Sequence, residues 1–173
     1  RRSIRFIFHS NKENIEVWID KEKIEKVLMN IISNAFKYTK NGGEISIDCR
    51  EKDNRVILHI CDNGLGIKTD DVNHIFERYY QGENSTQGGT GIGLALAKAV
   101  IDQHKGRIWV ESTYTKGTDF YVELLLGKDH FDNDKVKIQP KSITVTTSKT
   151  TEMSELGEHI SLDLLSEDEK PVV

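Results

Sequence analysis

Along the first 127 residues, apolar positions repeat in some segments every second residue, as in strands, and in others at helical spacing. Apolar residues alternate with polar ones over 5–9, 15–19, 44–50, 55–61, 107–111 and 118–126, which predicts six strands. Apolar residues recur at helical spacing from Ile24 to Ala35 and again over 93–104, which predicts two helices. The pattern indicates an α+β fold, a two-layer sandwich with helices on one face of a mixed, largely antiparallel sheet.

Capping and turn residues predict where the helices and strands begin and end. Asp20 should cap the first helix, with Glu22 in its first turn, and the run 41–43 (Asn-Gly-Gly) should end it. Asp53 and Asn54 predict a hairpin turn, and Gly106 is expected to cap the second helix after Lys105.

The character of the sequence changes after Gly127. Residues 128–173 carry six Lys against ten Asp and Glu, so this segment holds the whole net charge of −4, and Ser and Thr crowd 142–154. We therefore expect one domain over 1–127, followed over 128–173 by an acidic, Ser/Thr-rich linker without regular structure. A short helix over 153–164 is a weaker expectation, because Gly157 interrupts it.

Composition excludes several classes of function. The 173 residues carry a net charge of −4 without a basic stripe, so we expect no nucleic-acid contact. No apolar run reaches membrane-spanning length and the amino end does not resemble a signal peptide, so we expect no membrane contact and a cytoplasmic location. Cys49 and Cys61 lack metal-ligand spacing and are expected to be reduced, half-buried thiols. The chain does not begin with Met, which suggests a fragment.

Three polar residues line one stripe of the first predicted helix. Asn30, Asn34 and Lys37 are spaced four and three apart, and Asn is a mediocre helix former. Carboxamide oxygens can help to hold a hydrated Mg²⁺, and a nearby Lys can meet phosphate oxygens. A solvated helix face would carry the same residues.

Two glycine clusters follow. In DNGLGI, Asp62 stands at a strand end as a possible acceptor for an amino group, while Gly64 and Gly66 allow a close backbone approach; an Asx turn would explain the same residues. In GGTGIGLALAK, glycines precede a helix, where free backbone N–H groups favour a phosphate. The spacing fits neither a Walker loop nor a dinucleotide fingerprint, and a flexible loop is the alternative.

Taken in order, these pieces resemble the ATP-binding catalytic domain of sensor histidine kinases, in the superfamily with gyrase, heat-shock chaperone ATPases and MutL. NIISNAFKYT resembles the N box, DNGLGI and GGTGIGLALAK the two glycine boxes, FERYY the F box and GTDF the closing strand motif. The resemblance covers about residues 1–127. It implies a Bergerat fold with a mixed sheet, three helices and a mobile ATP lid over 68–88.

The resemblance also implies a role for each matching residue. Asn34 would bind Mg²⁺, Asn30 and Lys37 would face the phosphates as the other catalytic residues, and Asp62 would accept the adenine amino group. The remaining ATP-binding residues would be Tyr38, Gly64, Gly66, Ile67 and Thr118 near the adenine, Phe76 and Arg78 in the lid, and Gly89, Thr90, Gly91, Ile92, Gly93 and Leu94 around the phosphates. Tyr79 departs from the family, in which many members carry Phe.

The expected activity is that of a protein histidine kinase. ATP-hydrolysing relatives carry a Glu where this chain has Asn30, and Asn cannot take a proton, which favours phosphoryl transfer over hydrolysis. None of the six His lies in the pattern of a phosphoacceptor helix, so the acceptor should lie on a dimerisation and histidine-phosphotransfer domain outside this chain. A serine kinase of the anti-sigma type and a nucleotide-sensing pseudokinase remain alternatives, with a gyrase-type ATPase last.

The final residues, EDEKPVV, resemble the start of a receiver domain, which points to a hybrid histidine kinase. A receiver domain or a response regulator is therefore an expected partner, with ATP and Mg²⁺ as ligand and cofactor.

Overall fold

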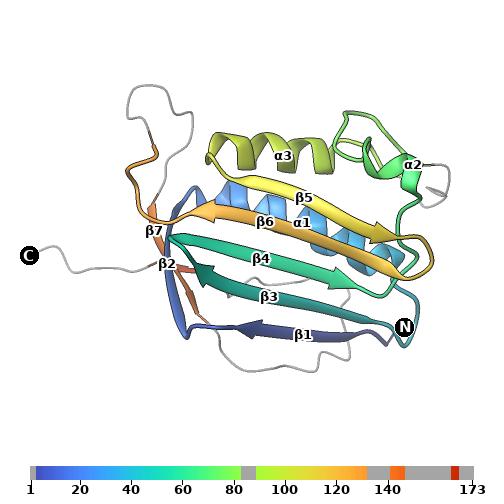
Figure 1. Ribbon diagram of the computed structural model, residues 1–173, viewed down its shortest axis with the longest axis horizontal. Helices are drawn as coiled ribbons and strands as arrows, with labels where there is room; N and C mark the ends of the chain where they lie inside the picture. Colours follow the sequence, from blue (N-terminus) through green and yellow to red (C-terminus); the bar gives the residue numbers. More distant parts are fainter. Residues whose placement is uncertain (1–2, 83–88, 132–140, 147–164, 168–173) are drawn as a thin grey trace, which may run out of the picture.

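A five-stranded sheet forms the frame of the molecule (Figure 1). The computed structural model describes residues 3–82, 89–131, 141–146 and 165–167, the last two ranges for their backbone alone. The strands lie in the order β1 (Arg5–Ser10), β3 (Glu44–Lys52), β4 (Arg55–Asp62), β6 (Gly117–Leu125) and β5 (Arg107–Thr113). β1 and β3 are parallel and the other pairs are antiparallel, as the alternating pattern predicted.

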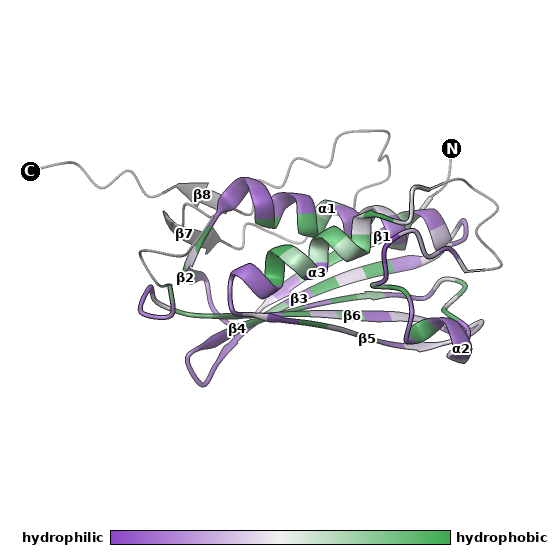
Figure 2. Cartoon of the chain, turned by 90° about the horizontal axis from the view of Figure 1, so that it is seen from above, coloured by the Kyte–Doolittle hydropathy of each residue, from purple (hydrophilic) through white to green (hydrophobic). Residues whose placement is uncertain are grey.

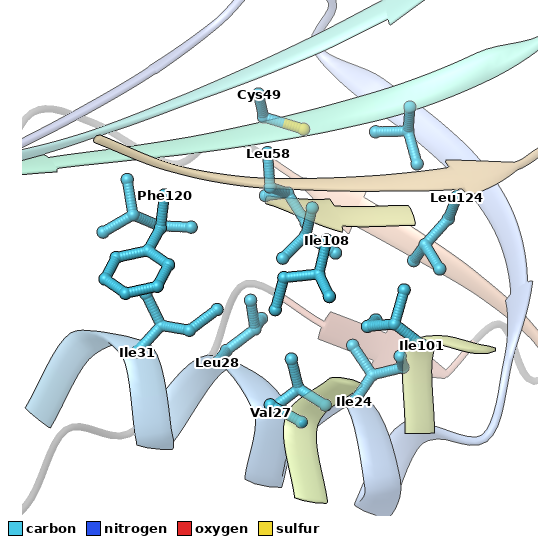
Figure 3. Packing of buried hydrophobic residues seen from close by; sticks show 14 of the residues in the cluster. Ile24, Val27, Leu28, Ile31, Cys49, Leu58, Ile101, Ile108, Phe120 and Leu124 are labelled. Atoms are coloured by element: carbon cyan, nitrogen blue, oxygen red, sulfur yellow. The ribbon is translucent and has the colours of Figure 1, made fainter. Parts of the chain in front are cut away.

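Helices α1 (Lys21–Tyr38) and α3 (Gly93–Gln103) lie on one face of this sheet (Figure 2). Apolar side chains of both helices, among them Ile31 and Ile101, interdigitate with those of the sheet (Figure 3). Ile31, Ile101 and Val122 are completely buried. Burial of such side chains is the main stabilising contribution to the fold. No helix in the described ranges combines the length and the apolar composition that crossing a bilayer demands.

Neither α1 nor α3 covers the opposite face of the sheet (Figure 2). Along β4, Leu58 and Ile60 are buried toward the helices, while His59 and Cys61, which alternate with them, are only half-buried. This period of two separates an apolar face from a polar, partly solvated one.

The helix ends follow the sequence with one correction. Asp20 caps α1 by accepting a hydrogen bond from the Lys23 N–H at 3.2 Å. At the end of α3 the left-handed residue is Lys105 (φ 55°), whereas Gly106 had been expected to fill this role. Gly106 is needed for another reason, because a Cβ there would lie 2.4 Å from the Glu123 carbonyl oxygen.

The expected linker also needs a correction. The Ser/Thr-rich stretch was expected to lack regular structure, but β7 (Lys141–Thr146) pairs antiparallel with β2 (Asn14–Ile19). β8 (Leu165–Glu167) adds a third strand. The β-branched residues of β7 favour a strand once an edge is available, and β2 supplies that edge. The helix expected over 153–164 lies outside the described residues.

Candidate functional site

A cavity of about 420 Å³ opens between α1, the start of α3 and the segment 65–82. Its floor is formed by Asp62, where β4 ends, and by Thr118, where the antiparallel strand β6 begins. Of the residues singled out in the sequence, these line it: Asn30, Asn34, Lys37, Tyr38, Asp62, Gly66, Ile67, Gly89, Thr90, Gly91, Gly93, Leu94 and Thr118. The volume suits a small-molecule ligand.

Asp62 provides a buried acceptor at one end of the cavity. Only 6% of the residue is exposed, and its Oδ1 accepts a hydrogen bond from the Gly64 N–H at 2.9 Å. Burial raises the pKa of Asp62 to about 6, while hydrogen bonds from the backbone of Gly64 and Thr118 favour the charged form. The carboxylate is therefore ionised at neutral pH and can accept a hydrogen bond from a ligand.

A hydroxyl network orients Thr118 beside Asp62. Ser112 Oγ donates to the Gly117 carbonyl oxygen at 2.8 Å and accepts from the Ile67 N–H at 2.9 Å. Thr118 Oγ1 lies 3.1 Å from Ser112 Oγ. Because the single Ser112 hydroxyl proton is used on Gly117, Thr118 must donate to Ser112, and the Thr118 lone pairs are left to accept from a ligand.

At Gly66 the backbone passes very close to the Thr113 carbonyl group, beside the Ser112 network. Gly66 has φ +69°, and a Cβ there would lie 2.2 Å from the Thr113 carbonyl oxygen. No residue with a side chain fits at that distance, so the glycine is required by packing as well as by conformation.

The other end of the cavity carries the ammonium group of Lys37 and the backbone of a glycine-rich loop. Lys37 Nζ lies 3.8 Å from the position that a Cβ of Gly89 would occupy. Asn34 lines the same region from α1, and Gly91 and Gly93 come from the loop that leads into α3. Unpaired N–H groups at the start of a helix and a nearby ammonium group together favour a bound anion.

Asn30 has a structural contact that the sequence did not reveal. Its Nδ2 donates to the Gly93 carbonyl oxygen at 3.1 Å and so ties α1 to the first turn of α3. The pair fixes the distance between the helix that carries Asn34 and the glycine loop.

The segment 65–82 covers the cavity. Phe76 packs edge-on against Phe120 of β6, with ring centroids 6.4 Å apart, and so attaches the segment to the sheet. The short helix α2 (Thr69–Val72) lies in this segment, and its Asp71 accepts a hydrogen bond from the Tyr80 hydroxyl. Residues 83–88 of the expected lid lie outside the described part.

Four residues that the resemblance assigned to the site do not line the cavity. Gly64 packs against the Tyr38 carbonyl oxygen, and Phe76 packs against Phe120 of the sheet. Arg78 and Ile92 are exposed and do not line the cavity. The backbone N–H of Tyr79 donates to the Gly91 carbonyl oxygen at 2.8 Å, while its side chain is 74% exposed, so its hydroxyl reaches water.

Several lining residues were missed by the sequence reasoning. They come from α1, from the segment 65–82 and from β6: Ser33, Ala35, Leu65, Lys68, Asp71, Ile75, Tyr80, Gln81, Gly82 and Phe120. Helical spacing could have identified Ser33, which lies four positions before Lys37. The lid residues have no periodic signal, because their positions depend on turns.

Comparison with protein families places residues 19–128 in a match to the family described as histidine kinase-, DNA gyrase B-, and HSP90-like ATPase. The sensor histidine kinase WalK of Bacillus subtilis is 41% identical over 135 residues, which are 75% of this chain and 22% of WalK. Histidine kinase P4 of Formosa agariphila is 31% identical over 186 residues, covering 96% of this chain and 14% of that protein. The chain thus spans a minor part of either relative.

Solved structures agree with these matches. The catalytic domain of the histidine kinase ThkA, in a nucleotide-free form, superposes with a TM-score of 0.64 and 29% identity, over 71% of this chain and 79% of that one. ThkA in complex with the response regulator protein TrrA matches with a TM-score of 0.61 and 26% identity, over 72% of this chain and 34% of that one.

Proposed function

Because this chain belongs to the histidine kinase-, DNA gyrase B- and HSP90-like ATPase family, we propose that its cavity binds Mg²⁺-ATP and supplies the γ-phosphoryl group to a protein histidine. One observation carries this proposal. A single cavity has an ionised, buried acceptor, Asp62, at one end and a cation with a glycine loop, Lys37 and Gly89, at the other. The adenine amino group and the phosphates of ATP present the complementary chemistry.

The identity of residue 30 favours transfer over hydrolysis. Its carboxamide cannot remove a proton from water, and its Nδ2 is engaged with the Gly93 carbonyl oxygen. A site without a base at this position has no residue there to activate water for hydrolysis, and leaves activation of the nucleophile to the acceptor.

Asn34 is the residue that we expect to hold Mg²⁺ at the phosphate end of this cavity. A carboxamide oxygen is a hard ligand, and Mg²⁺ in such sites takes few protein ligands and completes its shell with phosphate oxygens and water. When bound, the ion would neutralise charge on the phosphates. Lys37 and the backbone N–H groups around Gly89 and Gly91 would orient the same phosphates.

An apolar surface beside the phosphate end suits the docking of an acceptor domain. Tyr79, Ile92 and Leu96 are 74%, 40% and 46% exposed, which is unusual for large apolar side chains grouped near one loop. We expect the helical dimerisation and histidine-phosphotransfer domain to cover these three side chains during transfer. The partner that takes the phosphoryl group onward would be a receiver domain or a response regulator, and the chain would act in the cytoplasm.

The transfer is tested by supplying the parent kinase's dimerisation domain as a separate chain together with radiolabelled ATP and Mg²⁺. We expect acid-labile phosphohistidine on that domain and none on this chain alone. Leu96→Ala should reduce transfer several-fold with nucleotide affinity unchanged, while Asp62→Asn should abolish both.

Acid-stable phosphoserine on an acceptor protein would contradict the histidine assignment. Robust phosphohistidine on this chain by itself would contradict the separate acceptor. Undiminished transfer by Leu96→Ala would show that the acceptor domain docks elsewhere.

A further inference from the structure

A row of stacked side chains crosses the face of the sheet that is turned away from the helices. The Arg107 guanidinium carbon lies 4.8 Å from the Trp109 ring centroid, and the Trp109 and Tyr121 rings stack at 4.9 Å and 7°. Tyr121 then stacks on His59 at 4.5 Å and 4°. The last contact fixes the plane of the His59 ring.

His59 belongs to a cluster of three potential metal ligands. Its Nε2 lies 2.7 Å from Asp119 Oδ1, and one ligand atom each from His59, Cys61 and Asp119 lies within 4.8 Å of the other two. His59 and Cys61 are two apart on β4, and Asp119 is the register partner of Cys61 on β6. Among the described residues, this is the one such group of three.

The cluster holds its thiol in an unfavourable environment for ionisation. Burial raises the pKa of Cys61 to about 12, and the hydrogen bond and charge of Asp119 act in the same direction. A hydrogen bond from Ser46, the register partner of Cys61 on β3, is too small an effect to reverse this. The free protein therefore keeps a protonated thiol beside a carboxylate and an imidazole.

We propose that His59, Cys61 and Asp119 form a binding site for a borderline transition-metal cation such as Zn²⁺. The cation replaces the proton that His59 Nε2 shares with Asp119, so the neutral ring carries its proton on Nδ1. It binds Nε2 of His59, a carboxylate oxygen of Asp119 and the sulfur of Cys61, whose proton passes to solvent. Water fills the fourth position, because none of the described helices covers this face.

The distances suit this ion. Ligand atoms about 2.0–2.3 Å from a tetrahedral Zn²⁺ lie roughly 3.3–3.8 Å from one another, so small side-chain rotations accommodate it. Thiolate and imidazole favour Zn²⁺, Co²⁺ and Cu²⁺ over the hard ion Mg²⁺, which distinguishes this site from one built around Asn34. Loss of the thiol proton makes the affinity rise with pH.

The site lies directly behind the adenine end of the cavity. Cys61 precedes Asp62 and Asp119 follows Thr118, and these two pairs are in register on β4 and β6. Side chains of adjacent strand residues point to opposite faces, so the cation and the nucleotide would act on the same two strands from opposite sides. Any coupling between them must be reciprocal.

Titration of the whole chain with Co²⁺, in the absence of nucleotide, tests the proposal. We expect a thiolate-to-cobalt charge-transfer band that saturates at one ion per chain and is displaced by Zn²⁺ but not by Mg²⁺. Cys61→Ser should abolish the band, and His59→Gln or Asp119→Asn should weaken binding by about tenfold or more. Ions near Asn34 give no thiolate band, so this result is independent of nucleotide binding.

Two matched variants serve as controls. His9 and Asp48 form a similar pair on the same face, 3.1 Å apart but without a thiol, so His9→Gln should leave the titration unchanged. Cys49→Ala removes the other thiol, which faces the core, and should also bind normally. Absence of a thiolate band in the unmodified chain, or its persistence in Cys61→Ser, would overturn the proposal. Circular dichroism verifies that each variant is folded.

Discussion

At the scale of single residues, the Asp62 end of the cavity, where we propose that the adenine binds, is built from groups whose hydrogen bonds are already formed. Asp62 accepts from Gly64, Ser112 donates to Gly117, and the Thr118 hydroxyl is thereby directed as an acceptor. Groups ordered before the ligand arrives do not have to be ordered by it, and this preorganisation raises affinity. Ser112 acts here as a positioning residue, because it contacts Thr118 and does not line the cavity.

We predict that Ser112→Ala weakens the binding of adenosine by about threefold to tenfold, because Thr118 loses the acceptor for its proton and can rotate. Unfolding free energy should fall by about 1 kcal/mol per lost hydrogen bond. Calorimetric titration with adenosine and, separately, with tripolyphosphate measures the two ends of the cavity.

Tripolyphosphate affinity should stay unchanged in Ser112→Ala, since the phosphate end is formed by other residues. Ser10→Ala, which removes an exposed hydroxyl that bonds locally to Lys12, is the matched control. Equal loss of affinity for both ligands would indicate a general structural defect and contradict the positioning role.

At the scale of elements, a buried histidine joins the two main helices. His104, 1% exposed, ends α3; its Nδ1 lies 2.8 Å from the Val100 carbonyl oxygen, and its Nε2 accepts from the Asp20 N–H at 3.0 Å. Because Nε2 accepts, the proton of the neutral ring lies on Nδ1. Burial lowers the pKa of His104 below the usual value of 6.5, since desolvation of the charged ring outweighs the hydrogen bond to Val100 and the charge of Asp20, which both raise the pKa.

This shift predicts a stability that depends on pH. A histidine with a lowered folded-state pKa contributes its full stability above 6.5, and the contribution is lost as pH falls from 6.5 toward and through the folded pKa. The raised pKa of Asp62 acts with the opposite sign, because the folded state takes up that proton first. The His104 contribution must therefore be measured as a difference from a variant.

His104→Gln is the suitable variant, since its amide can donate to Val100 and accept from Asp20 without titrating. Denaturant unfolding at several pH values between 8 and 5 should show that the stability advantage of the unmodified chain over the variant declines as pH falls. An advantage that stays constant or grows with acid would contradict the neutral, buried assignment of His104.

At the scale of the whole molecule, local patterns predicted the fold and only part of the site. The alternation over β3 and β4 and the apolar spacing on α1 specify which face is buried, so the two layers follow from the sequence. The motifs also singled out Asp62 and the glycine loop, which line the cavity. Each of these features depends on residues that are neighbours along the chain.

The features that sequence reasoning missed depend on contacts between distant segments. The bond from Asn30 to Gly93 and the network around Ser112 join residues of different elements, so no local period reveals them. The strand β7 forms because β2 offers an edge far away in the sequence. The close approach of Gly106 to the Glu123 carbonyl oxygen likewise joins residues that lie far apart in the sequence.

Calorimetric titration of this chain with a nonhydrolysable ATP analogue and Mg²⁺ tests the central claim most directly. The account predicts saturable binding of one nucleotide per chain, loss of binding in Asp62→Asn, and in Asn34→Ala a loss of the Mg²⁺-dependent part alone. Adenosine should still bind Asn34→Ala, because the substitution leaves the Asp62 end of the cavity intact. Failure of the unmodified chain to bind the analogue, or full binding by Asp62→Asn, would contradict the account.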